Sequence, residues 1–224
     1  RGTKRQCRYV RPVFMGLVER KEAEQIVGQL NELCVENGYR IGTGFLTTYQ
    51  VLQVLTDYGY ADTAYRMIEN ENCPGWLYEV NCSATTCWEG WDAIEPDSGR
   101  LKPLSQNHYA PGAVVAWLFS RCAGIRAKAP GFAKVEIRPT PGGTLTWAEA
   151  SYQSVKGEIR VRWERKVDMF LMDVTIPEGV EAAVVLPDGI RIDHAKSGRY
   201  QCPEEENSSS TGDAEKRRQT LEIY

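Results

Sequence analysis

Residues 85–92, Thr-Thr-Cys-Trp-Glu-Gly-Trp-Asp, place the carboxylate of Glu89 between two indoles, Trp88 and Trp91. A carboxylate beside flat aromatic walls can hold a water molecule and remove its proton, which is the task of a general base in hydrolysis. Cleavage of a glycosidic bond in this way also requires a second carboxyl group that acts as the acid. Three acidic side chains follow between positions 92 and 97. Their closeness in sequence does not place them across a sugar from Glu89, so the stretch supplies a candidate base without its acid.

The same residues have a purely structural interpretation. Thr86 followed three residues later by Glu89 fits the capping box, in which the hydroxyl and the carboxylate satisfy backbone N–H groups at a helix start. Trp88 and Trp91 would then share one face of a short helix, which Pro96 would end. A helix start also keeps a carboxylate ionised, so the two interpretations are compatible. The spacing alone leaves the choice open.

Metal and cofactor chemistry have little support in the sequence. The seven cysteines form no Cys-x-x-Cys pair, and the two histidines, His108 and His194, do not stand at ligand spacing. The Gly-Thr-Gly-Phe stretch at 42–45 lacks the third glycine and the preceding strand of a dinucleotide loop. We therefore expect no metal and no cofactor. Free thiols are typical of a reducing compartment, which favours the cytoplasm.

Composition narrows the class of protein further. The chain has 224 residues, with 42% hydrophobic and 25% charged residues, which is typical of a globular protein with one large or two small domains. A net charge of −3 gives neither a basic surface for nucleic acid nor a polybasic patch for a membrane. No apolar run approaches the roughly 20 residues that a membrane span needs. We expect no nucleic-acid or membrane partner.

The first half of the chain has helical periodicity. Apolar residues recur at helical spacing, and glycines follow the expected helix ends. Helices are predicted over residues 21–37, 45–59, 61–70 and 110–124.

After residue 130 the period changes to alternation, which is typical of strands. Residues 157–165, 168–177 and 180–189 alternate apolar and polar side chains and are separated by turn signals, which predicts an antiparallel β-sandwich. The domain boundary is predicted near residues 126–132, and the polar end of the chain is expected to be disordered. Three tryptophans on apolar faces of these elements are expected in the core, namely Trp117, Trp147 and Trp163.

Several blocks of the sequence, in this order, resemble the bacterial α-L-rhamnosidases of glycoside hydrolase family 78. The most specific are Thr-Thr-x-Trp-Glu-x-Trp at 85–91 and Asn-His-Tyr at 107–109. They are accompanied by GYRIGTGFLTTYQVLQVLTDYGYADTAYRMI, CPGWLYEV, LSQNHYAPGAVVAWLFSRCAGI, PGFAKVEIRPTPGG and LTWAEASYQSVKG. The resemblance extends over residues 8 to 190.

The resemblance implies helices followed by strands, as part of an (α/α)6 barrel over residues 1–128 and an antiparallel β-sandwich over 129–200, with a polar tail over 201–224. It implies inverting hydrolysis of terminal α-L-rhamnose from glycosides. The glutamate of the first motif, here Glu89, is the general base of the family. The histidine of the second motif, here His108, lines the sugar site, and Trp88 and Trp91 are expected as its wall.

One departure limits this expectation. In the family the general acid lies in the earlier half of the helical barrel, and no motif around it occurs in these residues. The resemblance therefore implies the C-terminal part of a longer enzyme, inactive by itself. The alternatives are a carbohydrate-binding module without catalysis and another (α/α)6 glycosidase with a different sugar preference. The aglycone and the oligomeric state do not follow from the sequence.

Overall fold

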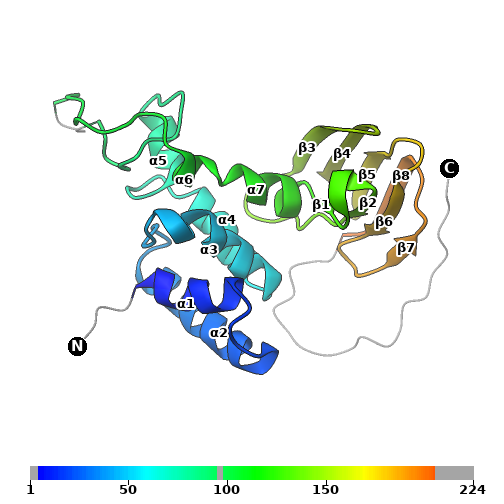
Figure 1. Ribbon diagram of the computed structural model, residues 1–224, viewed down its shortest axis with the longest axis horizontal. Helices are drawn as coiled ribbons and strands as arrows, with labels where there is room; N and C mark the ends of the chain where they lie inside the picture. The colour runs from blue at the N-terminus through cyan, green and yellow to red at the C-terminus, as the bar shows by residue number, and fades with distance from the viewer. Residues whose placement is uncertain (1–4, 95–97, 205–224) are drawn as a thin grey trace. The chain divides into compact units, whose positions relative to one another are not determined.

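The computed structural model describes residues 5–94 and 98–204. The chain divides into two compact units, the first ending at Leu118 and the second beginning at Phe119. The first unit is helical and the second is built from strands (Figure 1). Within the described residues, no helix has the length and apolar character needed to cross a membrane.

The helical unit contains three of the four predicted helices and others that the periodicity did not delimit. The helices predicted over 21–37, 45–59 and 61–70 are confirmed, with ends within two residues. The bounds are α1 Gln6–Phe14, α2 Arg20–Glu36, α3 Phe45–Asp57, α4 Ala61–Ile68, α5 Trp76–Asn81, α6 Tyr109–Gly112 and α7 Val115–Trp117.

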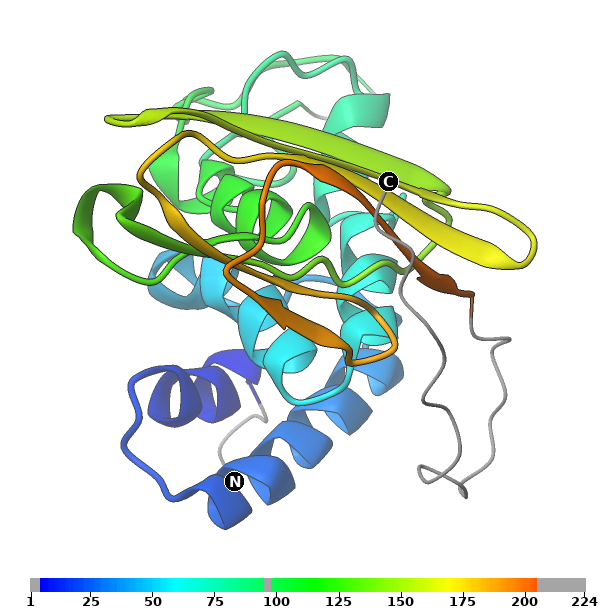
Figure 2. The same ribbon diagram turned by 90° about the vertical axis from the view of Figure 1, so that its right-hand side faces the viewer.

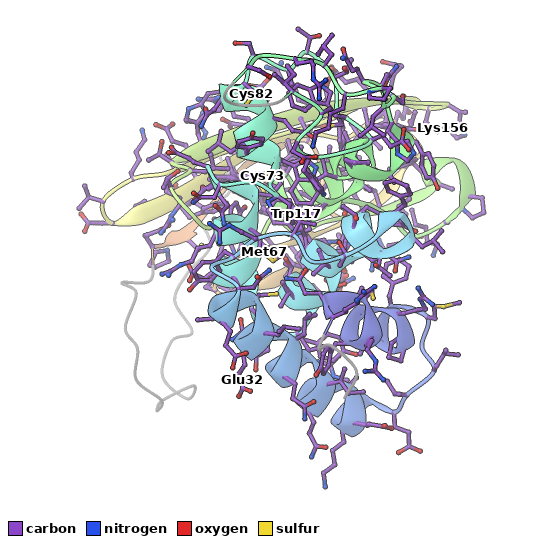
Figure 3. The ribbon with its side chains drawn as sticks, turned by 90° about the vertical axis from the view of Figure 1, so that its left-hand side faces the viewer. Glu32, Met67, Cys73, Cys82, Trp117 and Lys156 are labelled. Atoms are coloured by element: carbon purple, nitrogen blue, oxygen red, sulfur yellow. The ribbon has the colours of Figure 1, made fainter. Side chains whose placement is uncertain are left out.

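The core of this unit lies between α1, α2, α3 and α4. Along α2, the side chains buried at helical spacing are Ala23, Val27, Leu30 and Cys34. The Trp117 indole is fully buried, its Nε1–H donates to the Thr56 hydroxyl over 2.9 Å, and it meets the Tyr65 ring edge-on. Figure 3 shows Trp117 and Met67 within the helical unit. These contacts hold α7 against α3. They thereby help to position the preceding segment, which begins at residue 108.

The single helix predicted over 110–124 is wrong. The segment is α6, then α7, then a π-helix, η1, at Leu118–Cys122. Between α6 and α7 the backbone bonds span three residues, as from Val114 N–H to the Pro111 carbonyl over 3.2 Å. Proline and glycine at 111 and 112 favour this change of helical geometry, because proline lacks an N–H and glycine is a poor helix former.

The second unit contains two four-stranded sheets, which form two layers (Figure 2). One sheet has the order β1-β2-β6-β7 and the other β3-β4-β5-β8. The bounds are β1 Ile125–Ala127, β2 Lys134–Ile137, β3 Trp147–Ser154, β4 Gly157–Arg165, β5 Met169–Thr175, β6 Glu181–Val185, β7 Arg191–Asp193 and β8 Gly198–Pro203, with a 3-10 turn, η2, at Pro130–Phe132.

The alternating strands are confirmed, but the purely antiparallel pairing is wrong at one place. On β4 the buried side chains are Ile159, Val161 and Trp163, as period two requires. The strands β2 and β6 run parallel, whereas the other pairs are antiparallel. The chain between β2 and β6 crosses to the second sheet and back, and such a long connection permits a parallel return.

Trp147 is not in the core, contrary to the sequence prediction. It is the first residue of β3, an edge strand, and is 53% exposed. The guanidinium of Arg162 lies 4.8 Å from the centre of its ring. Alternation assigns this residue to the outer face of the sheet, where a cation covers part of the indole.

The division between the units precedes the boundary predicted near 126–132. The Trp163 Nε1–H donates to the Cys122 carbonyl over 2.8 Å, and β1 pairs with β2, so residues from 119 onward belong to the sheet unit. At the other end, the predicted polar tail begins inside β8, which extends to Pro203. The prediction of disorder for residues 205–224 lies outside the described residues.

Candidate functional site

The segment after α5, residues 82–94, contains no helix, so the predicted short helix with a capping box is wrong. The Thr86 hydroxyl donates to the Gln106 carbonyl and not to a backbone N–H of its own turn. Trp88 and Trp91 therefore do not share a helical face. A distant segment, which the local pattern could not reveal, satisfies the polar groups of this loop.

That distant segment is 105–108, and it brings the two motifs together. The His108 N–H donates to the Cys87 carbonyl over 2.8 Å, and the Glu89 N–H donates to the Ser105 carbonyl over 2.8 Å. The loop that carries Glu89 and the loop that carries His108 thus lie side by side, held by backbone hydrogen bonds.

The Glu89 side chain is held by the same partner. Its Oε2 accepts the Ser105 N–H over 3.0 Å, and the residue is half-buried. A hydrogen bond from a backbone N–H fixes the orientation of a carboxylate. One oxygen is thereby held by the protein, while the carboxylate retains capacity to accept a proton from water.

His108 is the N-cap residue of α6, and a backbone N–H of that helix orients its ring. Its Nδ1 accepts the Ala110 N–H over 3.3 Å, so the imidazole proton is carried by Nε2, which can donate to a ligand. The ring lies 4.4 Å from that of Phe45, the first residue of α3, and is stacked 5.1 Å from that of Tyr109. Both Phe45 and Tyr109 are exposed. An imidazole donor thus lies among aromatic faces.

The tryptophans of the first motif differ in exposure. Trp88 is 3% exposed, which leaves little ring surface for a ligand in this chain. Trp91 is half-buried and meets the Trp76 ring edge-on at 5.3 Å. The Trp76 Nε1–H donates to the Pro111 carbonyl over 3.0 Å, which ties this aromatic cluster to α6. Trp88 therefore supports the loop from within, and Trp91 is the indole that retains accessible surface.

Of the three acidic neighbours of Glu89, only Asp92 lies within the described residues. Asp92 forms an ion pair with Lys102, and the hydrogen bond from that ammonium group lowers the pKa of the Asp92 carboxyl. Glu95 and Asp97 lie outside the described residues. Within the described chain, no cluster of three or more His, Cys, Asp or Glu side chains could hold a metal ion.

Sequence reasoning missed two residues of the site. Glu79, on α5, is 2% exposed, and the backbone N–H of Trp88 acts on its carboxylate. Burial raises the pKa of Glu79 to about 7. A glutamate within the otherwise apolar run at 76–80 was the signal that could have identified it. Ser105 gave no signal, because it binds Glu89 through its backbone.

Two family models match the chain. The model of the bacterial alpha-L-rhamnosidase 6 hairpin glycosidase domain matches residues 2–122, and that of the bacterial alpha-L-rhamnosidase C-terminal domain matches residues 124–200. The two matches meet close to the structural division after Leu118. They include both loops of the candidate site.

Curated relatives agree. An alpha-L-rhamnosidase of Streptomyces avermitilis is 37% identical over 184 residues, which is 81% of this chain and 18% of the relative. One of Formosa agariphila is 33% identical over 187 residues, which is 83% of this chain and 20% of the relative. The chain thus spans about a fifth of the length of the curated relatives it matches.

Solved structures show the same fold. The native alpha-L-rhamnosidase of Aspergillus terreus aligns with a TM-score of 0.83 at 30% identity, over 89% of this chain and 24% of that one. The Streptomyces avermitilis alpha-L-rhamnosidase complexed with L-rhamnose aligns with a TM-score of 0.76 at 37% identity, over 80% of this chain and 18% of that one. With a family model covering more than half of its residues, the chain belongs to the bacterial alpha-L-rhamnosidase family.

Proposed function

We propose that these residues form part of an inverting α-L-rhamnosidase in which Glu89 is the general base. The observation that carries the proposal is the pairing of the two motif loops, which holds the Glu89 carboxylate on the Ser105 N–H beside the loop of His108. A base must be fixed in orientation and reached by water, and Glu89 is both hydrogen-bonded and half-buried.

In the proposed reaction, water attacks the anomeric carbon of the rhamnosyl group as Glu89 takes its proton. The bond from that carbon to the aglycone oxygen breaks, and a carboxylic acid protonates the leaving oxygen. In inverting enzymes the two carboxyl groups stand about 6.5–9.5 Å apart, which leaves room for the water. We propose that this acid belongs to a part of the enzyme outside these 224 residues, since the chain spans about a fifth of the length of its curated relatives.

His108 and Trp91 are proposed to hold the sugar. The Nε2–H of His108 can donate to a sugar hydroxyl or ring oxygen, and the accessible part of the Trp91 indole offers an apolar face to the C–H groups of the ring. Trp88, which is 3% exposed, is proposed to support the loop that carries Glu89 and Trp91. We further propose that the helical unit is one part of an (α/α)6 barrel that encloses this site.

L-rhamnose is the proposed sugar because the Streptomyces avermitilis structure, 37% identical to this chain, contains it. A terminal α-L-rhamnoside is therefore the substrate class to test first. Aryl glycosides of rhamnose, glucose and arabinose distinguish it from another glycosidase specificity.

The test uses the full gene product that contains these residues, with Glu89→Gln as the variant. Loss of a general base is expected to lower kcat by about 10²–10⁴-fold with KM little changed, since the amide keeps the shape of the side chain. NMR of the first product formed should show the β-anomer of L-rhamnose, as inversion requires.

A matched control is Glu32→Gln, the same chemical change on an exposed side chain of α2 (Figure 3). It should leave kcat unchanged. Wild-type turnover by Glu89→Gln would contradict the assignment of the base. Sugar binding without turnover by the full, folded gene product would instead support a carbohydrate-binding module.

A further inference from the structure

Glu79 is a buried carboxylate that the proposed reaction does not use. It is 2% exposed, and no cation pairs with it among the described residues. Its Oε1 has no hydrogen-bond partner within the described chain. Glutamate is rarely buried without a partner, because removing the carboxylate from water is costly. An apolar side chain of similar size would favour folding more, so stability alone does not account for this residue.

The polar group that acts on the Glu79 carboxyl belongs to the loop of the candidate base. It is the backbone N–H of Trp88, the residue that precedes Glu89, and it favours the ionised form of Glu79 against the effect of burial. This part of the loop is neither helix nor strand, so regular structure does not satisfy its backbone groups. The next N–H, that of Glu89, donates to the Ser105 carbonyl. Successive amides of the loop are thus fixed from two sides, by α5 and by the segment before α6.

We propose that Glu79 is a positioning residue for the hydrolytic reaction, which holds the Trp88 amide so that the Glu89 carboxylate is fixed toward the attacking water. This rests on the function proposed above for Glu89. Glu79 touches neither sugar nor water, and acts through the backbone of its neighbour. A shift of the loop by about 1 Å is enough to reduce turnover by as much as 10²-fold.

Two substitutions separate the hydrogen bond from the packing. Glu79→Gln keeps an acceptor oxygen for the Trp88 N–H, whereas Glu79→Met fills a similar volume without one. In the full gene product, Glu79→Met is expected to lower kcat by about tenfold or more with KM within about twofold, because substrate contacts are untouched. Glu79→Gln is expected to retain kcat within about threefold, since the acceptor remains.

The control for general loss of stability is Val27→Ala. Val27 is fully buried in α2, which packs against α1, α3 and α4, so its truncation lowers the unfolding midpoint without touching the loop. Its kcat should remain at the wild-type value below the midpoint. Wild-type kcat for Glu79→Met, or an equal loss for the Gln and Met variants, would overturn the positioning role.

A measurement on the unmodified protein covers the case in which Glu79→Met fails to fold. Hydrogen exchange of the Trp88 amide should be slow in the wild type and in Glu79→Gln, and exchange at the rate of an exposed amide in the wild type would overturn the proposal. The two proposals fail separately. An active Glu89→Gln removes the proposed function, whereas an inactive Glu89→Gln beside a fully active Glu79→Met removes only the role of Glu79.

Discussion

Glu79 in the helical unit and Glu136 in the sheet unit are both buried, at 2% and 8% exposure, but their surroundings differ. Glu136 lies on β2, where its carboxylate pairs with Arg191 over 3.0 Å and with Lys128 over 3.2 Å. Glu79 has a backbone N–H in place of a cation. Burial raises the pKa of both carboxyls, but at Glu136 the two cations outweigh it and lower the pKa below its usual range. At Glu79 the pKa rises to about 7.

For two buried carboxylates, the presence or absence of cationic partners thus decides whether the effect of burial on the pKa is offset. Arg191 reaches Glu136 from β7, because neighbouring strands align side chains on one face of a sheet. Among its described residues, the loop after α5 presents the Trp88 amide and no cation to Glu79. A site of this kind costs stability, which is typical of groups kept for function.

The largest expected effect is the pH dependence of the helical unit. Because the folded pKa of Glu79 is raised from 4.5 to about 7, its contribution to stability is complete below pH 4.5 and is lost as the pH rises through 7. The loss amounts to about 2 kcal/mol once partial solvent screening is allowed for. Glu79→Gln should remove this slope. Hydrogen exchange of the α5 amides between pH 4.5 and 8, converted to opening free energies, measures it.

Glu32→Gln on α2 is the control, since the exposed side chain should leave the slope unchanged. A Glu79→Gln variant whose α5 amides keep the wild-type pH dependence would show that Glu79 titrates normally. The comparison with Glu136 would then fail, because the pKa of Glu79 in the helical unit would not be raised.

The sheet unit should respond to pH in the opposite direction. The pKa of Glu136 is lowered, so its contribution is complete above the unfolded pKa of 4.5 and is lost as the pH falls through the folded value. Glu136→Gln is expected to destabilise the strands by about 1 kcal/mol at pH 7, a value discounted for the exposure of its cationic partners. The deficit should disappear in acid. Urea unfolding at pH 7 and pH 3 measures it, and an equal deficit at both values would indicate lost packing in place of lost charge.

Regular elements were predictable from the sequence, because their signals are local. The α2 stripe and the alternation of β4 appear in the structure with nearly the predicted ends. The parallel pairing of β2 with β6 depends on a long connection that alternation does not encode. Trp147 was misassigned because the faces of an edge strand differ only by register.

The candidate site was predictable only in part. The motif resemblance proposed Glu89 and His108 as site residues, which stays a prediction, whereas spacing alone left a capping role open for Glu89. The geometry of the loop depends on hydrogen bonds to residues 105–108. These residues are too far along the chain for local periodicity to predict the pairing. Glu79 was missed for the same reason, since its partner Trp88 follows only after the turn beyond α5.

The smallest expected effect concerns an exposed pair on the sheet. Asp173 and Arg199 face each other on β5 and β8 and form two parallel hydrogen bonds of 2.8 and 2.9 Å. The hydrogen bonds from Arg199 lower the pKa of the Asp173 carboxyl. Because both side chains are exposed, Asp173→Asn should lower the urea midpoint by less than Glu136→Gln does. The deficit should shrink in 1 M NaCl, where the Debye length falls to about 3 Å. The buried Glu136 should be less sensitive to salt, and an equal salt response of the two variants would contradict the view that burial protects its ion pairs from screening.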